Sequence, residues 1–88
     1  MRAKRIDNTA PALVAYAKSI GFDYEPINGV IDGILAFGME AFPVDWKSPG
    51  GELTKGQQKL VARGFPLWFI HRPEQLDALK AHALRKVA

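Results

Sequence analysis

The stretch VIDGILAFGMEAFPVDWK, which runs from Val30 to Lys47, contains two apolar segments separated by a short connection. The segments 30–37 and 41–47 are rich in aliphatic and aromatic residues, so we predict a strand for each. Gly38 and Met39 lie between them, and a two-residue connection that contains glycine is typical of a β-hairpin. We therefore predict a fold built around this hairpin, with Phe37 directly opposite Glu40.

The same turn determines where two acids lie. Positions paired across a hairpin have a constant sum, so Asp32 is expected opposite Asp45, with the two Cβ atoms about 5 Å apart. Two like charges so close destabilise a sheet unless a cation lies between them, and Mg²⁺ binds carboxylate and water oxygens. Lys47 follows on the same face as Asp45, where it is expected to hold a water or a phosphate oxygen beside the metal.

Three alternatives to this metal site stay open at the level of sequence. A three-residue turn would place the two acids on opposite faces, and Pro43 indicates a bulge or an edge position. Asp32 is also explained as an ordinary acid at the end of a strand. Asp45 and Lys47 are also explained as an exposed ion pair, because one face of an antiparallel sheet can be solvated.

The rest of the chain supplies helices and two more strands. Thr54 and Gln57 match a capping box, which marks the start of a helix. The apolar run Pro66 to Ile70 predicts a strand buried on both faces in a parallel arrangement. The order α-β-β-β-α-β-α predicts an α/β fold, a mixed β-sheet flanked by helices, in one domain of residues 1–88. The expected elements are helix 9–20, strands 22–26, 30–37 and 41–47, helix 54–63, strand 66–70 and a helix that begins at Pro73.

Several apolar side chains are expected in the core. Trp46, Trp68 and Phe69 are assigned to it, although tryptophans also concentrate in dimer interfaces. The last helix is expected to bury one side, which carries Leu76, Leu79, Ala83 and Leu84.

Composition narrows the class of protein. The chain has no cysteine, which excludes disulfides and thiol chemistry and is compatible with a reducing cytoplasm. No apolar run is long enough for a membrane span and the first residues lack a signal-peptide core, so we expect a cytoplasmic protein. Residues 45–88 carry eight Lys and Arg against four Asp and Glu, which suits a polyanionic partner.

The string from Asp32 to Gln57 resembles a known family. Asp32-Gly33-Ile34-Leu35, followed by Val44-Asp45-Trp46-Lys47, a Gly/Pro loop and Leu53-Thr54-x-x-Gln57, is similar to the virus-type replication-repair nuclease (VRR-NUC) family of the PD-(D/E)xK superfamily. The resemblance implies a restriction-endonuclease-like core and a Mg²⁺- or Mn²⁺-dependent endodeoxyribonuclease. Stand-alone members, many from phages, are homodimers that cut branched DNA such as four-way (Holliday) junctions in the bacterial host cytoplasm.

The resemblance also implies roles for single residues. Asp32, Asp45 and the main-chain carbonyl of Trp46 would bind the metal, and Lys47 would orient the attacking water and stabilise charge in the transition state. Gln57 would support Lys47 or the water, although the capping box alone also explains it. Asp7 is the candidate for a further metal ligand; an acid near a helix N-terminus is also favoured by the helix dipole.

Basic and histidine residues outside this string have two interpretations. Lys55, Lys59 and Arg63 lie about one helical turn apart, as a track for DNA phosphates or as a solvated helix face. His71 and His82 are expected at the surface, and no catalytic role is expected for either, because neither lies in a metal-ligand spacing. Two rival functions stay open: a non-catalytic nucleic-acid-binding module, and a structural subunit that retains the nuclease fold.

Overall fold

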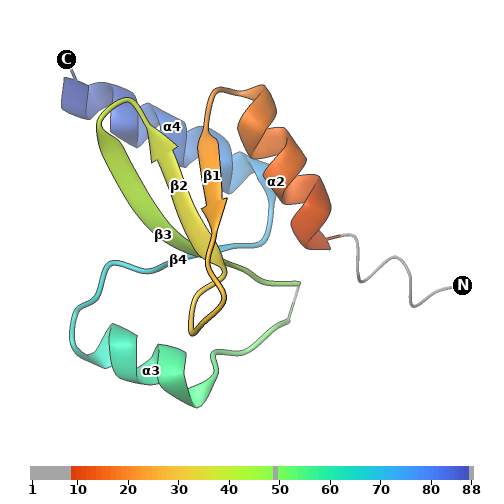
Figure 1. Ribbon diagram of the computed structural model, residues 1–88, viewed down its shortest axis with the longest axis vertical. Helices are drawn as coiled ribbons and strands as arrows, with labels where there is room; N and C mark the ends of the chain where they lie inside the picture. Colours follow the sequence, from red (N-terminus) through yellow and green to blue (C-terminus); the bar gives the residue numbers. More distant parts are fainter. Residues whose placement is uncertain (1–8, 49, 88) are drawn as a thin grey trace, which may run out of the picture.

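The computed structural model describes residues 9–48 and 50–87, and it has the predicted order α-β-β-β-α-β-α (Figure 1). The mixed α/β class is what this order implies. The elements are α2 (Thr9–Ser19), β1 (Asp23–Pro26), β2 (Gly33–Phe37), β3 (Glu40–Trp46), α3 (Lys55–Ala62), β4 (Trp68–Ile70) and α4 (Pro73–Val87).

The four strands form one mixed sheet in the order β1-β2-β3-β4. β2 is antiparallel to β1 and to β3, to which short connections join it, whereas β3 and β4 are parallel. A parallel pair needs a long crossover connection, and α3 lies within it. The predicted mixed sheet is therefore confirmed.

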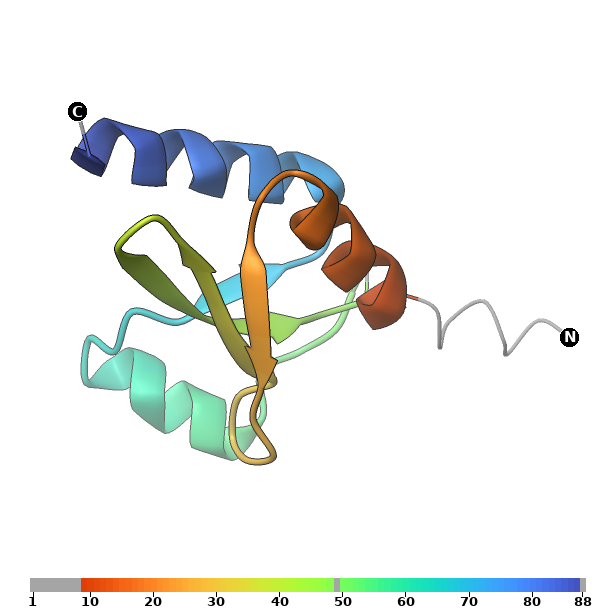
Figure 2. The same ribbon diagram turned by 45° about the horizontal axis from the view of Figure 1, so that its top comes forward.

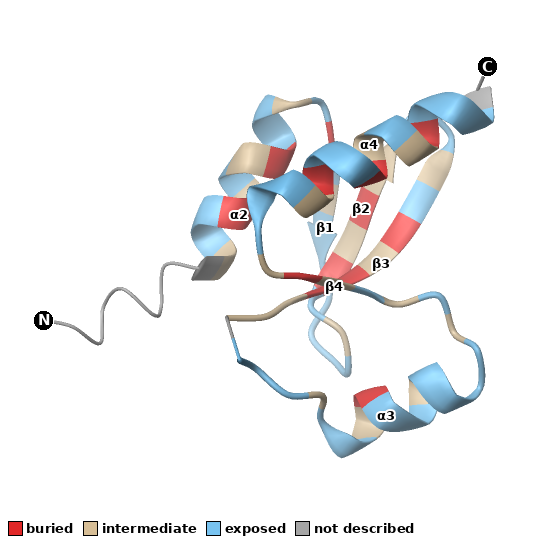
Figure 3. Cartoon of the chain, turned by 180° about the vertical axis from the view of Figure 1, so that it is seen from behind, coloured by how far each residue is buried: buried red, intermediate tan, exposed pale blue. Residues whose placement is uncertain are grey.

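Helices α2 and α4 lie over one face of the sheet, and α3 lies on the opposite side (Figures 1 and 2). Side chains alternate along a strand, so each strand turns every second residue toward α2 and α4. Leu35 on β2 and Val44 on β3 are fully buried. Figure 3 shows buried stretches on both of these strands. The buried hydrophobic core consists of Leu13, Ala17, Phe22, Leu35, Phe42, Val44, Ile70, Leu76, Leu79 and Ala83.

The face toward α3 is less well covered. Ile34, Pro43 and Phe69, whose side chains alternate with the core residues, are only partly buried. Asp45 belongs to the same alternation but is buried. Asp45, and Lys47 two residues further on, therefore face the thinly covered side of the sheet.

Several details of the predicted fold are wrong. The strand predicted from Val30 begins only at Gly33, and Val30 is exposed. The last strand is not buried on both faces, because β4 is an edge strand of three residues and Trp68 remains 39% exposed. Leu84 is 47% exposed although Ala83 is buried, because it lies about 100° around the helix from the side that carries Leu76, Leu79 and Ala83. Trp46 is partly buried and packs against the core, whereas Phe69 is partly buried on the face toward α3, outside the core to which the sequence assigned it.

In the part of the chain that is described, no helix combines the length and hydropathy that a membrane crossing requires.

Candidate metal centre

Gly38 and Met39 form the tight turn that sets the register of β2 against β3. Gly38 has a φ of 63°, and a glycine at the first turn position is what a type II′ hairpin turn requires. Phe37 pairs with Glu40 across the turn, and the pairing continues without a slip to Gly33 and Val44. The predicted two-residue turn and its register are therefore confirmed as far as Gly33.

Asp32 lies immediately before β2, where the regular ladder ends in a β-bulge. Its main-chain N–H donates to the Val44 carbonyl over 3.1 Å, although Val44 is already paired with Gly33. Two consecutive residues thus face one, which defines a bulge. Asp32 is consequently not a regular partner of Asp45; its carboxylate turns toward the backbone of β3, and Oδ2 accepts the Trp46 N–H over 2.8 Å.

The main chain around Asp32 is also fixed from the side of β1. The Tyr24 hydroxyl donates to the Asp32 carbonyl over 3.1 Å and accepts from Trp46 Nε1 over 3.0 Å. A Cβ atom at Gly33 would lie 2.5 Å from the Tyr24 ring and 2.6 Å from the Glu25 carbonyl oxygen. Glycine at position 33 therefore allows the close approach of β1 that holds Asp32 in place.

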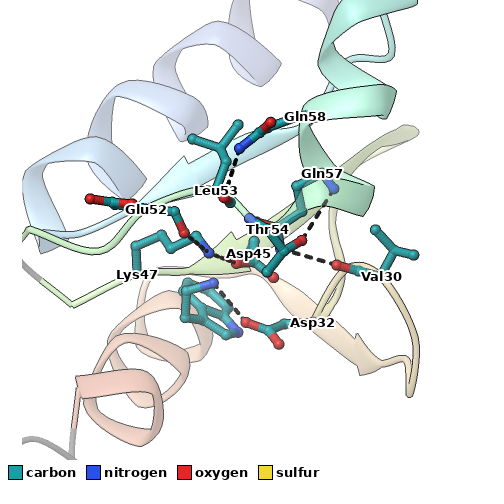
Figure 4. Close-up of polar contacts among 10 residues, drawn as sticks. Val30, Asp32, Asp45, Lys47, Glu52, Leu53, Thr54, Gln57 and Gln58 are labelled. Carbon is teal, nitrogen blue, oxygen red and sulfur yellow. Dashed lines mark hydrogen bonds and ion pairs between the residues drawn. The ribbon is translucent and has the colours of Figure 1, made fainter.

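Asp45 is the buried acid of the site and is only 5% exposed. Its Oδ2 lies 3.1 Å from Lys47 Nζ (Figure 4), and both side chains are largely buried. The same ammonium donates to the Glu52 carbonyl over 3.1 Å and lies 5.9 Å from the centroid of the Phe69 ring. The pair is therefore not the solvent-exposed ion pair that the sequence left open.

The nearness of the two acids changes the protonation of Asp32. Partial burial of its carboxyl raises the pKa of Asp32 above the usual 3.8, and the charge and contact of the Asp45 carboxyl raise it further. The hydrogen bond from the Trp46 N–H and the positive charge of Lys47 lower it, but the net pKa is raised. The charged form of Asp32 is thus less well stabilised here than that of a free carboxylate in water, which favours a bound cation.

The donor atoms fit a hard divalent cation. Asp32 and Asp45 supply carboxylate oxygens, which Mg²⁺ and Mn²⁺ prefer, and Trp46 lies next in the chain with its carbonyl. Within residues 9–48 and 50–87, no three acidic or histidine side chains come together, so main-chain and water oxygens would complete the shell. Mg²⁺ commonly keeps several waters. Asp7, the further ligand implied by the resemblance, lies outside the described residues.

Gln57 lies beside the site but is used in other contacts. Its Oε1 accepts the Thr54 N–H over 3.1 Å, and its main-chain N–H donates to Thr54 Oγ1 over 3.2 Å, so the predicted capping box is confirmed. Its Nε2 donates to the Val30 carbonyl over 3.1 Å, which ties α3 to the loop before Asp32 (Figure 4). The support of Lys47 by Gln57 stays a prediction, and the observed contacts are structural.

Lys55, Lys59 and Arg63 are all exposed and follow one another at intervals of four residues, so they lie along one side of α3. Arg63 is the C-cap residue, and its N–H bonds back to carbonyls of the last turn. None of the three shares a contact with Asp45 or Lys47 among the described hydrogen bonds and ion pairs. Their role in DNA binding stays a prediction.

Tyr24 is the supporting residue that the sequence interpretation missed. It also lines an apolar groove of about 600 Å³ between α2 and the sheet, at whose edge Asp32 and Trp46 lie. Its position in the sequence could have indicated this role, because Tyr24 is the one aromatic residue of β1 and the alternation of side chains along paired strands places it on the same face as Trp46.

The resemblance to the nuclease family rests on the residue pattern from Asp32 to Gln57. The fold brings Asp32, Asp45 and Lys47 together at the end of β3 and leaves Gln57 at the border of this cluster. Comparisons of this chain with family models, with curated proteins and with solved structures gave no match.

Proposed function

We propose that the chain is a metal-dependent endonuclease that hydrolyses phosphodiester bonds in DNA. The observation that carries this proposal is the pairing of two neighbouring carboxylates, Asp32 and Asp45, with an ammonium 3.1 Å from one of them. A carboxyl whose pKa is raised by burial and by a neighbouring carboxylate, as that of Asp32 is, is stabilised in its charged form by a nearby cation, and a lysine beside it suits a reaction in which negative charge develops on phosphate oxygens.

Asp32 and Asp45 would hold the divalent ion, with the Trp46 carbonyl as the third protein ligand. When bound, such an ion activates a water molecule and neutralises charge on the phosphate. Asp32 is already oriented by the Trp46 N–H, and Asp45 is held by Lys47, so little side-chain freedom remains to be lost when the ion arrives.

Lys47 has a defined capacity to assist. An ammonium has three N–H donors, of which one is directed to Asp45 and one to the Glu52 carbonyl. The third remains for the attacking water or a non-bridging phosphate oxygen. In the reaction the water oxygen bonds to phosphorus, the bond to the leaving sugar oxygen breaks, and Lys47 stabilises the charge that develops on the phosphate.

The order α-β-β-β-α-β-α with its mixed sheet supports a restriction-endonuclease-like core. Together with the resemblance to stand-alone VRR-NUC proteins, it supports a homodimer that acts on branched DNA. A twofold dimer would present two equivalent sites to two strands.

The test is incubation of the purified protein with a labelled four-way junction, a flap and a plain duplex, each with Mg²⁺, Mn²⁺ or EDTA. We expect cleavage of the branched substrates with either metal, none in EDTA, and none by Asp45→Asn. Lack of cleavage by the wild-type protein with every metal overturns the proposal, and cleavage of the plain duplex alone overturns the preference for branches. Light scattering measures the oligomeric state.

One observation favours a second candidate, a nucleic-acid-binding module without catalysis. Lys47 already neutralises Asp45, and the described chain brings only two acidic side chains to the centre. This candidate predicts salt-dependent DNA binding that Mg²⁺ does not change, and no metal-linked rise in melting temperature.

A further inference from the structure

A second cavity, of about 470 Å³, lies between the loop that follows β3 and the connection from β4 to α4. It is lined by Gly50, His71, Arg72 and Gln75. The carboxyl ends of β3 and β4 lie at the same end of the sheet, because the two strands are parallel (Figure 1). Crevices outside the carboxyl ends of parallel strands are common places for ligands in α/β proteins.

One residue of the cavity lining, His71, lies beside the backbone of Lys47. The Lys47 N–H donates to the Ile70 carbonyl over 2.9 Å, so the backbones of Lys47 and His71 emerge side by side, about 5 Å apart as neighbouring strands are. The Lys47 ammonium also reaches across to β4, where it lies over the Phe69 ring. A group bound by His71 and Arg72 would therefore lie close to a group bound by Lys47.

Gln75 fixes the main chain at this corner. Its Oε1 accepts the N–H groups of His71 and Arg72 over 2.6 and 3.0 Å, and its Nε2 donates to the Phe69 carbonyl over 3.0 Å. The N–H groups of His71 and Arg72, which lie just before α4, are thus already used. An anion in this cavity would be bound by side chains, and the guanidinium of Arg72 offers a fork of donors that matches a phosphate.

The side chains of Arg72 and His71 are not engaged elsewhere in the described chain. Neither makes a hydrogen bond or an ion pair with residues 9–48 or 50–87. Glu74, the nearest acid in sequence on α4, is exposed and forms no ion pair with Arg72. Arg72 thus has a main chain fixed by Gln75, lines a cavity, and has a guanidinium without a partner in the described chain, which suits it to binding an external anion.

We infer that this cavity is a phosphate subsite, in which Arg72, assisted by His71, binds a phosphate of the DNA strand next to the one at Lys47. This inference rests on the proposed nuclease function for the identity of the strand. The subsite would set the direction in which the strand crosses the ends of β3 and β4, and so which phosphate reaches Asp32 and Asp45.

The experiment compares Arg72→Gln with Arg85→Gln. Both variants lose one arginine charge, both sites are exposed, and Arg85 lies at the other end of α4, roughly 20 Å away along the helix. The Gln75 contacts use only the main chain of residue 72, so Arg72→Gln leaves them in place. The probe is a fluorescein-labelled four-way junction titrated in EDTA at several salt concentrations, with thermal melts to confirm folding.

Arg72→Gln is expected to weaken binding roughly tenfold, as loss of a charged hydrogen bond does, and to reduce the slope of log K against log salt by about 1. Arg85→Gln is expected to change affinity by less than about twofold. Equal behaviour of the two variants, or no binding by the wild-type protein, overturns the subsite.

Cleavage assays with Mg²⁺ separate this inference from the proposed function. Wild-type cleavage together with equal binding by the two variants rejects the subsite and retains the nuclease. Loss of affinity in Arg72→Gln without any wild-type cleavage retains the subsite and rejects the nuclease.

Discussion

The carboxylate of Asp32 accepts the main-chain N–H of Trp46 over 2.8 Å, which joins two residues 14 positions apart. The bond holds Asp32 at the end of β3, one residue from Asp45, in the absence of an ion. A main-chain donor also favours the charged form of the acid, so it opposes the burial and the Asp45 charge that raise the pKa. Asp32 is therefore oriented by the fold but remains poorly neutralised, which is the property a cation site requires.

Asp32→Asn is expected to change how stability depends on pH. Because the pKa of Asp32 is raised on folding, its contribution to stability is fully present below the usual 3.8 and is lost as pH rises through the raised pKa. Asparagine keeps an oxygen for the Trp46 N–H but does not ionise. In EDTA at neutral pH, Asp32→Asn should melt at a higher temperature than the wild-type protein, and the difference should vanish in acid.

With Mg²⁺, the wild-type protein should melt at a higher temperature than Asp32→Asn. The ion competes with the proton at Asp32, so its stabilisation of the wild-type protein should grow as pH rises, and Asp32→Asn should gain little. Thermal melts with and without Mg²⁺ measure both effects. Asp23→Asn, which changes an exposed acid on β1, is the matched control. An equal gain for wild type and Asp32→Asn would contradict the role of Asp32 as a ligand.

Removal of Asp45 should destabilise the fold as well as the site. Asp45→Ala leaves the largely buried ammonium of Lys47 without its partner, which costs roughly 3 kcal/mol of unfolding free energy. The double variant Asp45→Ala, Lys47→Met should lose less than the sum of the two single variants, because the unpaired charge is gone. Urea unfolding provides these values, and strict additivity would show that the pair does not interact.

The parts of the fold that local rules determine were predictable. Gly38 supplies the positive φ that the first position of the hairpin turn needs. The Thr54–Gln57 capping box begins α3 through contacts within four residues. The exposure of Trp68 was not predictable from the apolar run in which it lies. An edge strand and a central parallel strand share that pattern, and only the number of neighbouring strands distinguishes them.

In the candidate site, too, the features set by local contacts were predictable and those set by contacts between distant segments were not. The alternation on β3 and the two-residue turn were enough to bring Asp32 and Asp45 near each other. The bulge at Asp32 was missed, because it depends on the passage of β1 against Gly33, a contact between segments that no local pattern encodes. Tyr24 was missed for the same reason, since its hydroxyl acquires its partners only when β1 pairs with β2.

Gly33→Ala should disturb the site without removing any of its functional groups. The new Cβ would lie 2.5 Å from the Tyr24 ring and 2.6 Å from the Glu25 carbonyl, so β1 must shift, at a cost of roughly 1–3 kcal/mol. The Asp32 carbonyl would lose its Tyr24 contact, and cleavage should fall with stability. Gly29→Ala is the control, since its nearest atom would be 4.0 Å away. Equal denaturant midpoints for the two variants would show that the close approach of β1 is unimportant.

Gln57→Ala should separate the structural contribution of Gln57 from a catalytic one. The side chain is 3% exposed and bonds both the Thr54 N–H and the Val30 carbonyl, so its loss should lower the unfolding free energy by about 1–3 kcal/mol. Gln58→Ala is the matched control, because Gln58 is exposed and makes one bond, to the Leu53 carbonyl.

Gln57→Glu gives the sharper result. Glutamate keeps an acceptor for the Thr54 N–H but cannot donate to the Val30 carbonyl when ionised, so the helix cap should survive while the tie between α3 and the loop before Asp32 is lost. Hydrogen exchange at α3 and cleavage rates, both measured well below the melting temperature, report the two roles. If Gln57 acts only through these contacts, cleavage by the folded variant should fall in proportion to the loosening of the Val30 loop. An intact loop with abolished cleavage would instead assign Gln57 to the reaction itself.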